Sequence, residues 1–205
     1  MTSTARVRPL RADVREQIVQ AAREEFVEHG YGGTSVAQVA TRAGFTKGAV
    51  YSNFGGKPEL FAASMQEYFA DLVGGAFADA LAAAAAAPVE LTPARAMARV
   101  LAADVLLGER WPALLAEFRT VVTAEPRLVD LYADLRVVQR GQLVEALRRA
   151  GDQVALKADL DLEVAATLLL TCVHGLSVER SAAPEAMPNA LVEALFTHVL
   201  EGIVA

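Results

Sequence analysis

Apolar residues recur at intervals of three and four along nearly the whole chain of 205 residues, and no long stretch alternates apolar and polar positions. A spacing of three and four places side chains on one face of an α-helix, whereas alternation is typical of a β-strand. Residues with high helix propensity, chiefly Ala, Leu, Glu, Arg and Gln, also dominate the sequence. The pattern therefore predicts an all-α protein of about nine helices.

Start and stop signals divide residues 13–56 into three short helices. Each begins at a residue whose side chain can cap a helix N-terminus, and the first two end at glycine, which readily adopts the conformation that ends a helix. In the first two helices, Glu or Gln follows the cap by three residues, as in a capping box. The predicted caps are Asp13, Ser35 and Thr46, and the predicted ends are Gly30 and Gly44.

Six longer helices are predicted for the rest of the chain, separated by proline and glycine. The first of these begins at Lys57, because Pro58 suits the first turn of a helix. It fades into an alanine-rich run that Pro88 ends. The remaining five helices are predicted at residues 92–108, 111–124, 126–151, 161–179 and 188–204.

The second and third predicted helices carry the pattern of a helix-turn-helix. Two helices that cross over a tight turn need a small residue on the first helix, a turn residue that tolerates a positive φ, and an apolar anchor on the second. Ala40, Gly44 and Val50 provide these features in order. Such a motif holds its second helix outward, where it can enter the major groove of DNA.

The second helix of this motif has side chains that suit contact with DNA. The four residues at its start are small or cationic, so that backbone N–H groups can approach phosphate closely. Three polar residues follow that can hydrogen-bond to phosphates or base edges, and a lysine opens the next helix. In order, these residues are Thr46, Lys47, Gly48, Ala49, Tyr51, Ser52, Asn53 and Lys57. The alternative is a three-helix packing unit with a solvated basic edge.

The net charge of −6 at first argues against a nucleic-acid-binding protein, because phosphate binding is driven by Lys and Arg. The charges, however, are distributed unevenly. Residues 1–57 contain eight basic and five acidic side chains, a net charge of +3, and the rest of the chain carries −9. The basic first quarter is therefore compatible with DNA contact confined to the helix-turn-helix.

Residues 30–36, 39–40, 43–54 and 57–61 closely resemble the signature of the tetracycline-repressor (TetR) family of transcriptional regulators. The resemblance covers about residues 13–61, and the rest of the chain agrees with the family only in the number and length of its helices. It implies a homodimer whose N-terminal domains bind a palindromic operator in double-stranded DNA. It also implies a divergent C-terminal domain that binds a small-molecule effector, which releases the DNA.

The DNA contacts of the family can be carried over onto the matching positions of this sequence. They place phosphate contacts at Thr34 or Ser35, Tyr51 and Lys57, and base contacts at Ala37, Thr46, Lys47, Gly48 and Ala49. Asn53 departs from the family pattern, which usually has His there, so this side chain can donate to phosphate but without a charge. Gly55 and Gly56 stand where a larger residue is common, which predicts a permissive hinge before the fourth helix.

These features divide the sequence into a flexible basic arm (residues 1–12), a helix-turn-helix DNA-binding domain (13–56) and a ligand-binding and dimerisation domain (57–205). The arm contains Arg6, Arg8 and Arg11. Such an arm either reaches a flanking minor groove of the DNA or forms a solvated tail.

Two apolar helices near the C-terminus are candidates for a dimer interface. Residues 164–178 are apolar almost all round, and the last predicted helix carries a second apolar stripe. Either both helices are buried within one subunit, or two from each subunit form a four-helix interface. The need of a helix-turn-helix protein for two DNA half-sites favours the interface. The candidate interface residues are Leu168, Cys172, Gly175, Leu176, Leu191, Leu195 and Val199.

Large apolar and aromatic residues, with a few polar ones, are candidates to line an effector pocket in the C-terminal domain. At helical spacing, such residues pack in a core more often than they line a pocket. A pocket built from them predicts a largely apolar or aromatic ligand. The candidates are Met65, Phe69, Met97, Trp111, Phe118, Tyr132, Arg136, Gln139, Cys172 and His174.

Other classes of protein find little support in the sequence. Cys172 is the only cysteine, which excludes a disulfide scaffold, and it lies on a different helix face from His174, so no metal site is expected. No phosphate-binding glycine loop or serine-nucleophile motif is present, so we expect no enzymatic activity and no cofactor. The uncharged run 164–178 is short for a membrane span, and the N-terminal arginines are incompatible with a signal peptide, so we expect a cytoplasmic protein.

The sequence therefore predicts a dimeric transcriptional repressor that a small, largely apolar or aromatic ligand releases from its operator. An activator or a ligand-independent regulator is the alternative within this class. A helical small-molecule-binding protein or enzyme with a vestigial helix-turn-helix is the alternative outside it.

Overall fold

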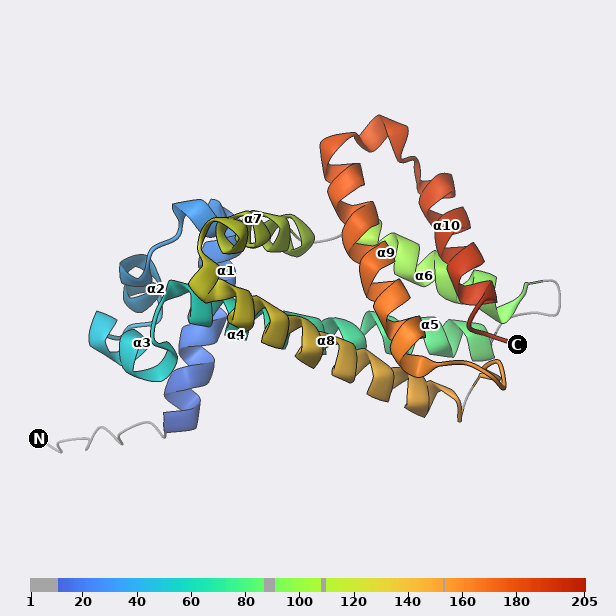
Figure 1. Cartoon of the computed structure of the whole chain (residues 1–205), viewed down its shortest axis with the longest axis horizontal. Helices are drawn as coiled ribbons and strands as arrows, with labels where there is room; N and C mark the ends of the chain where they lie inside the picture. The colour runs from blue at the N-terminus through green and yellow to red at the C-terminus, as the bar shows by residue number, and fades with distance from the viewer. Residues whose placement is uncertain (1–10, 87–90, 108–109, 153) are drawn as a thin grey trace, which may run out of the picture. The chain divides into compact units, whose positions relative to one another are not determined.

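A computed structural model of the chain describes residues 11–86, 91–107, 110–152 and 154–205. Within these ranges the chain forms ten α-helices, two 3-10 helices and no β-strand, which confirms the predicted all-α fold (Figure 1). The α-helices are α1 (Arg11–Gly33), α2 (Val36–Arg42), α3 (Lys47–Phe54), α4 (Lys57–Gly74), α5 (Ala76–Ala85), α6 (Pro93–Leu107), α7 (Trp111–Ala124), α8 (Val129–Ala150), α9 (Leu162–Ala182) and α10 (Asn189–Glu201). The 3-10 helices are η1 (Pro126–Leu128) and η2 (Pro184–Ala186).

Several helix boundaries differ from the prediction, and α1 continues to Gly33, past the predicted end at Gly30, where its backbone is kinked. Helix α1 begins at Arg11, so Asp13 lies in its first turn, where a carboxylate favours the positive end of the helix, and not at the cap. Gly75 has φ −95° and ψ −87° and divides the predicted fourth helix into α4 and α5. Of the predicted arm, Arg11 is therefore helical, and residues 1–10 lie outside the described ranges, as do the predicted stops at residues 88 and 108.

The chain divides into two compact units after Ser64, so that α4 begins in the N-terminal unit and ends in the C-terminal unit. The sequence placed the boundary at residue 57, where α4 starts. The unit extends further because Leu60 and Phe61, in the first two turns of α4, are fully buried in the N-terminal core.

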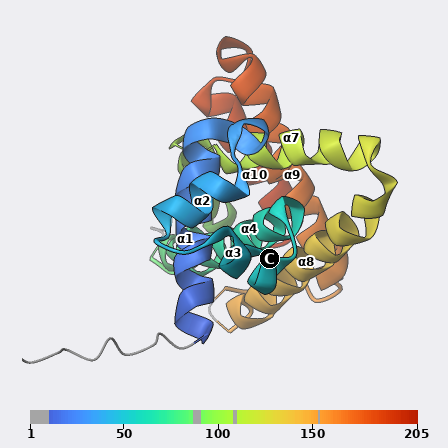
Figure 2. The same cartoon turned by 90° about the vertical axis from the view of Figure 1, so that its left-hand side faces the viewer.

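The core of the N-terminal unit combines three aromatic rings with the apolar face of α1. The rings of Phe26 and Phe61 meet edge to face with centroids 5.0 Å apart, and Tyr31 meets Phe61 at the same distance. Ile18 of α1 and Val39 of α2 are fully buried. Helix α2 packs against α1, and α3 packs against α2, so this core positions both helices of the predicted DNA-binding motif (Figure 2).

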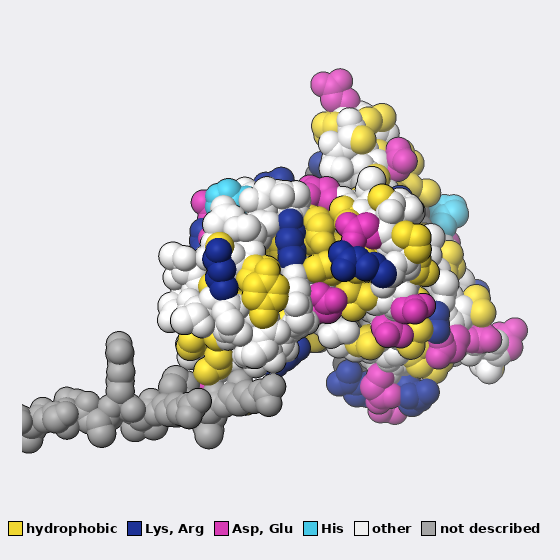
Figure 3. Space-filling view, turned by 60° about the vertical axis from the view of Figure 1, so that its left-hand side comes forward, with side chains coloured by type: hydrophobic (Ala, Val, Ile, Leu, Met, Phe, Trp, Pro, Cys, Tyr) yellow, Lys and Arg dark blue, Asp and Glu magenta, His cyan; other side chains and the backbone are white. Residues whose placement is uncertain are grey.

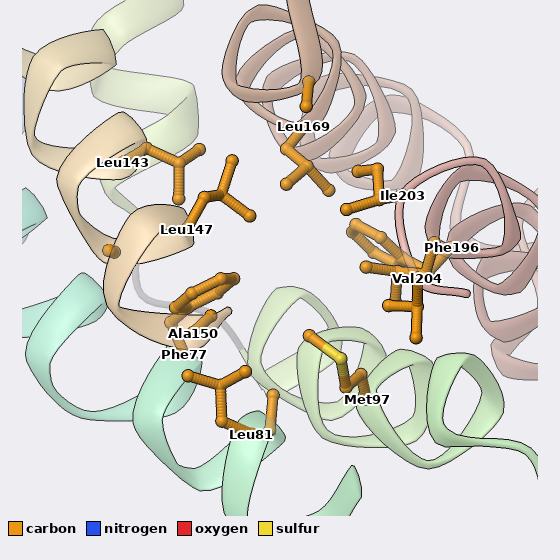
Figure 4. Packing of buried hydrophobic residues seen from close by; sticks show 14 of the residues in the cluster. Phe77, Leu81, Met97, Leu143, Leu147, Ala150, Leu169, Phe196, Ile203 and Val204 are labelled. Atoms are coloured by element: carbon orange, nitrogen blue, oxygen red, sulfur yellow. The ribbon is translucent and has the colours of Figure 1, made fainter. Parts of the chain in front are cut away.

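The core of the C-terminal unit lies among α5, α6, α8, α9 and α10. Phe77, Leu147 and Phe196 point into it from three of these helices, and Leu169 of α9 joins them (Figure 4). Helix α6 packs along both α5 and α10. Helix α9 is only partly buried within one chain, because Val164 and Leu168 leave an apolar face exposed.

Two segments of the described chain are long and apolar enough to cross a membrane by length and composition alone, namely α9 and Lys57–Ala85. Helix α9 is longer than the uncharged run 164–178, because it begins two residues earlier and ends four residues later. Core helices of soluble proteins meet the same criteria, and the backbone at Gly75 interrupts the other segment. This finding is therefore weak evidence for a membrane protein.

Candidate DNA-binding surface and ligand pocket

The turn between α2 and α3 has the geometry that the helix-turn-helix pattern predicts. Ala40 of α2 and Val50 of α3 are buried, and Gly44 between them has a φ of +73°. Residues with a side chain are strained at this φ, which explains the glycine. The N–H of Phe45 donates to the carbonyl of Ala40 over 2.9 Å and closes the turn. The predicted motif is therefore confirmed.

Helix α3 presents its first turn to solvent. The hydroxyl oxygen of Thr46 caps it by accepting a hydrogen bond from the N–H of Ala49 at 3.2 Å. Lys47 and Gly48 are exposed, and Tyr51 is 53% exposed one turn further on. On the face shown in Figure 3, Lys and Arg side chains are interspersed with acidic, polar and apolar ones. The surface thus offers a cation, a phenol and helix N-terminal N–H groups.

The two polar side chains that follow Tyr51 bond to their own helix. The Ser52 hydroxyl donates to the Ala49 carbonyl over 3.0 Å, and the Asn53 amide donates to the same carbonyl over 2.7 Å. Ser52 is exposed and can turn outward at the cost of one modest hydrogen bond, whereas Asn53 is half-buried. Ala49 and Ala37, both predicted to contact bases, are partly exposed.

Thr34 and Ser35, the alternative phosphate contacts before α2, have different surroundings. Thr34 is 3% exposed, and its hydroxyl lies 2.8 Å from the Gly30 carbonyl oxygen and 3.0 Å from that of Glu25. Ser35 is partly exposed and forms the predicted capping box with Gln38. The structure thus places Thr34 in the interior, where it fastens the end of α1, and leaves Ser35 as the surface residue of the pair.

Lys57 and Arg15 lie over aromatic rings of the N-terminal unit. The Nζ atom of Lys57 is 4.4 Å from the centroid of the Tyr31 ring and 3.5 Å from the Gly32 carbonyl oxygen. The guanidinium carbon of Arg15 is 5.0 Å from the centroid of the Phe54 ring. Cation–π contacts orient a cation without neutralising it.

Arg42 of α2 binds three carboxylates of α1, an interaction that the sequence pattern does not reveal. Its Nε, Nη2 and Nη1 atoms lie 2.6, 2.5 and 3.3 Å from oxygens of Glu25, Glu28 and Glu24. The hydrogen bond from Arg42 lowers the pKa of Glu28 below its usual value. We call these four residues the Arg42 cluster. It fastens α2 to α1 and neutralises one positive charge of the predicted DNA-binding domain.

Replacing Arg42 with glutamine is expected to lower the melting temperature, because three carboxylates lose their shared cation. A carboxyl whose folded-state pKa is lowered stabilises the fold above its unfolded-state pKa, and this contribution is lost as the pH falls through the folded-state pKa. The difference in melting temperature between wild type and R42Q should therefore be largest near neutral pH and shrink in acid. Thermal unfolding followed by circular dichroism from neutral pH to below about pH 4 measures it.

Arg127→Gln is the matched control, because the exposed Arg127 pairs with Glu125 at 2.8 Å on the protein surface. Surface pairs of this kind contribute little, so the control should melt like the wild type. An R42Q protein that melts like the wild type at neutral pH would contradict the structural role of the Arg42 cluster.

Helices α7, α8 and α9 line a pocket with a volume of about 340 Å³, which we call the α7–α9 pocket. This is near the lower end of the range of roughly 300–1,000 Å³ for small-molecule sites. Three predicted ligand-binding residues, Tyr132, Arg136 and His174, line it. The other lining residues are Leu115, Ala116, Arg119, Thr171, Gly175, Val178 and Glu179.

Arg136 is the centre of a hydrogen-bonded network at this pocket. Its Nη1 atom lies 2.9 Å from Gln139 Oε1 and 2.9 Å from His174 Nδ1. Burial and the guanidinium groups of Arg136 and Arg119 lower the pKa of His174 to about 3, so the ring is neutral at physiological pH. Because a guanidinium can only donate, Nδ1 of His174 accepts and Nε2 carries the ring proton. Gln139 is fully buried and supports Arg136 from the interior.

Five other predicted ligand-binding residues lie in the interior and do not line the α7–α9 pocket. Trp111 stacks on Tyr68 with ring centroids 5.0 Å apart, and Phe118 contacts Tyr132 at 6.4 Å. Met97 points into the core shown in Figure 4. The five residues are Met65, Phe69, Met97, Trp111 and Phe118.

Cys172 of α9 is partly buried against the C-terminal core, and burial raises the pKa of its thiol. It does not line the α7–α9 pocket, although His174, two residues further along the helix, does. No group of three or more His, Cys, Asp or Glu side chains that could hold a metal ion occurs in the described part of the chain.

A second pocket, with a volume of about 480 Å³, lies between α6 and α10. No sequence feature pointed to it. Its arginines are already paired, because the Nε atoms of Arg99 and Arg95 lie 3.1 and 3.9 Å from a carboxylate oxygen of Glu193. The charges of this pocket are therefore largely compensated within the protein.

Helices α9 and α10, which η2 joins (Figure 1), leave large apolar side chains exposed. Val164 and Leu168, one turn apart on α9, are 63% and 45% exposed, and Leu191 and Leu195, one turn apart on α10, are 41% and 40% exposed. Gly175 of α9 is also exposed. The remaining predicted interface residues, which are partly buried against the core, are Cys172, Leu176 and Val199. Exposed apolar patches of this kind are typical of protein interfaces.

Comparisons with known proteins agree with this architecture. The model of the tetR family of bacterial regulatory proteins matches residues 18–64, and that of the C-terminal domain of BetI-type transcriptional repressors matches residues 92–205. The HTH-type transcriptional repressor AcnR of Corynebacterium glutamicum is 26% identical over 163 residues, 78% of each chain. A TetR-family regulator from Mesorhizobium loti has a TM-score of 0.64 at 22% identity, covering 95% of this chain and 96% of that one. A regulator from Rhodococcus sp. RHA1 has a TM-score of 0.67 at 21% identity, covering 92% and 95%.

Proposed function

The chain belongs to the tetR family of bacterial regulatory proteins, which bind DNA and act as dimers, and we propose that it is a repressor whose DNA binding is controlled by a small-molecule effector. The match to BetI-type repressors and the similarity to the repressor AcnR support repression. The operator that suits a two-fold dimer is a palindrome whose half-sites are about 34–36 Å apart. Such a protein works in the cytoplasm, in contact with the chromosome.

The exposed first turn of α3 is the observation that carries this proposal. A helix-turn-helix fold holds it outward, with Lys47 and Gly48 exposed and Tyr51 half exposed. We assign the approach to base edges to the start of α3, and phosphate contacts to Tyr51, Ser35 and Lys57.

Helix α4 supports the proposed control by an effector. It begins at Lys57 in the N-terminal unit and ends at Gly74 in the C-terminal unit, so it belongs to both. An effector that binds more tightly to a state with α4 tilted shifts the dimer away from the spacing of the two α3 helices that fits DNA. Couplings of this kind are typically worth about 5–150-fold in affinity.

Replacing Lys47 and Tyr51 together with alanine is expected to weaken operator binding by at least about 100-fold, because each subunit loses a cation and a hydroxyl at the DNA. The slope of log affinity against log salt should fall by about 2, because each of the two subunits loses one cation, Lys47, from the DNA surface. Gel shifts and fluorescence anisotropy with DNA from upstream of the protein's own gene, over a series of salt concentrations, measure both effects.

Lys157→Ala is the matched control, because this lysine is exposed in the C-terminal unit and its loss changes the charge by the same amount. The control should bind the operator like the wild type. A wild-type protein that forms no salt-dependent, sequence-preferring complex at micromolar concentration would favour a small-molecule-binding protein with a vestigial helix-turn-helix. A transcription assay on the same DNA distinguishes a repressor from an activator.

A further inference from the structure

We infer that the effector of the α7–α9 pocket is a small monoanion, a carboxylate on a compact apolar body, held by Arg136 and Arg119. This inference rests on the proposed function, because it names the chemistry of the effector. It also narrows the expectation of a largely apolar or aromatic ligand, since it adds one negative charge.

The polar groups that line the pocket are mainly hydrogen-bond donors. Arg136 and Arg119 contribute two guanidinium groups, which can only donate. Neutral His174 accepts from Arg136 through Nδ1, so its other nitrogen, Nε2, is a donor. Tyr132 adds a phenolic hydroxyl, whereas the hydroxyl of Thr171 already donates to the Thr167 carbonyl over 2.8 Å. Donors of this kind favour a ligand rich in acceptors.

Among the described residues, no carboxylate pairs with the guanidinium of Arg136. In the described residues its hydrogen-bond partners are the neutral side chains of Gln139 and His174, and it forms no ion pair. Burial lowers the pKa of Arg136, which reflects the cost of holding this cation partly out of water. A bound carboxylate would offset that cost. Arg95 and Arg99 in the α6–α10 pocket differ, because Glu193 already pairs with them.

The lining residues set the charge and shape of the ligand. Glu179 also lines the pocket, so two guanidinium groups and one carboxylate leave one positive charge, which a monoanion balances. A carboxylate matches the planar geometry of a guanidinium, which can bind it through two parallel hydrogen bonds. Leu115, Ala116 and Val178 supply an apolar wall. The small volume of the pocket favours a compact body.

Binding of acids and of their neutral amides to the full-length protein, without DNA, tests the inference. The probes are 3-phenylpropionate and octanoate, compared with 3-phenylpropanamide and octanamide, by thermal shift and isothermal titration calorimetry. We expect at least one acid to raise the melting temperature and its amide to have little effect. Arg136→Gln should weaken binding of the acid by roughly tenfold or more, since charge-assisted hydrogen bonds are the strong ones.

Two further variants show whether R136Q loses binding through a folding defect or through the loss of the guanidinium group. Arg119 is exposed, so R119Q should fold normally and still weaken binding of the acid. Arg148→Gln is the control, because Arg148 lies on α8, pairs with Glu145 at 2.5 Å and does not line the pocket. R148Q should bind the acid like the wild type.

The inference is overturned if none of the acids binds, if acids and amides bind with equal affinity, or if neither R136Q nor R119Q weakens binding of the acid. Operator binding measured on the same preparations separates this inference from the proposed function. If the protein binds DNA but none of the acids, only the proposal of an anion-binding pocket is refuted. If it binds an acid but no DNA, only the proposal of a repressor is refuted.

Discussion

Replacing both Leu168 and Leu195 with glutamate is expected to separate the dimer into monomers and to abolish tight operator binding. Both leucines are nearly half exposed on α9 and α10, and the replacements occur twice in a two-fold interface. At roughly 1 kcal/mol for each half-buried leucine, the lost apolar contact is about 4 kcal/mol, close to three orders of magnitude in the dimer Kd. Repulsion among the new carboxylates adds to this loss.

Sedimentation velocity over a range of concentrations measures the change in association, and gel shifts measure its effect on DNA binding. Val137→Glu is the matched control, because Val137 is also apolar and 55% exposed but lies on α8. This control should remain dimeric. If the double variant still sediments as a dimer at micromolar concentration, the dimer interface does not lie on α9 and α10.

Replacing Val50 with aspartate is expected to unfold the N-terminal unit. Val50 is fully buried between the helices of the DNA-binding motif, so the new carboxyl must lose its hydration without gaining a partner. Together with the lost valine packing, we expect a cost of roughly 3–5 kcal/mol, a large part of the 5–15 kcal/mol that stabilises a typical domain. Amide hydrogen exchange should show loss of protection in residues 11–64, and DNA binding should disappear.

Ser52→Asp provides the comparison, because it introduces the same charge at an exposed position two residues further along α3. We expect a melting temperature close to that of the wild type but weak operator binding, since the new carboxylate would repel the phosphates of the DNA that we propose α3 binds. Loss of DNA binding with a retained fold in S52D, and loss of both in V50D, would separate the surface role of α3 from its role in the core. A stable V50D protein would contradict the observed packing.

Local signals predicted most of the helix boundaries, because caps and stops depend on residues that are close in sequence. Ser35 and Thr46 cap α2 and α3 as expected, and Asp161 caps α9. Asp13 was misassigned because a carboxylate suits the first turn of a helix as well as its cap. Gly75 was missed because a glycine in an alanine-rich helix is sometimes tolerated.

Features that depend on a partner from another helix were not predictable from the pattern. The ion pairs of Arg42 are an example, because the three carboxylates that bind it lie 14 to 18 residues earlier in the sequence, on another helix. Thr34 stands next to a cap and was read as a surface residue. The positive φ of Gly30 turns the chain there, and the Thr34 hydroxyl instead meets carbonyls at the end of α1.

The candidate pocket shows the same limit. Met65, Phe69 and Met97 have the residue types of both a core and a ligand site, and helical spacing alone does not say which neighbour covers them. Arg136 and His174 were more informative, because a charged and a polar residue on otherwise apolar helices need a specific reason to be there.

Buried alanines line both α5 and α6, which pack against each other. Alanine loses no side-chain entropy on burial. Its side chain is too small to be shortened to make room for a ligand, and replacing it with a larger residue overpacks the contact between the helices at a cost of typically 1–3 kcal/mol. Substitutions that change the inducer specificity, in evolution or in the design of a biosensor, are therefore better placed on α7, α8 and α9 than on α5 and α6. A mutant library for that purpose belongs at positions 132, 171 and 178 on α8 and α9, whose side chains line the α7–α9 pocket and are not buried in the core.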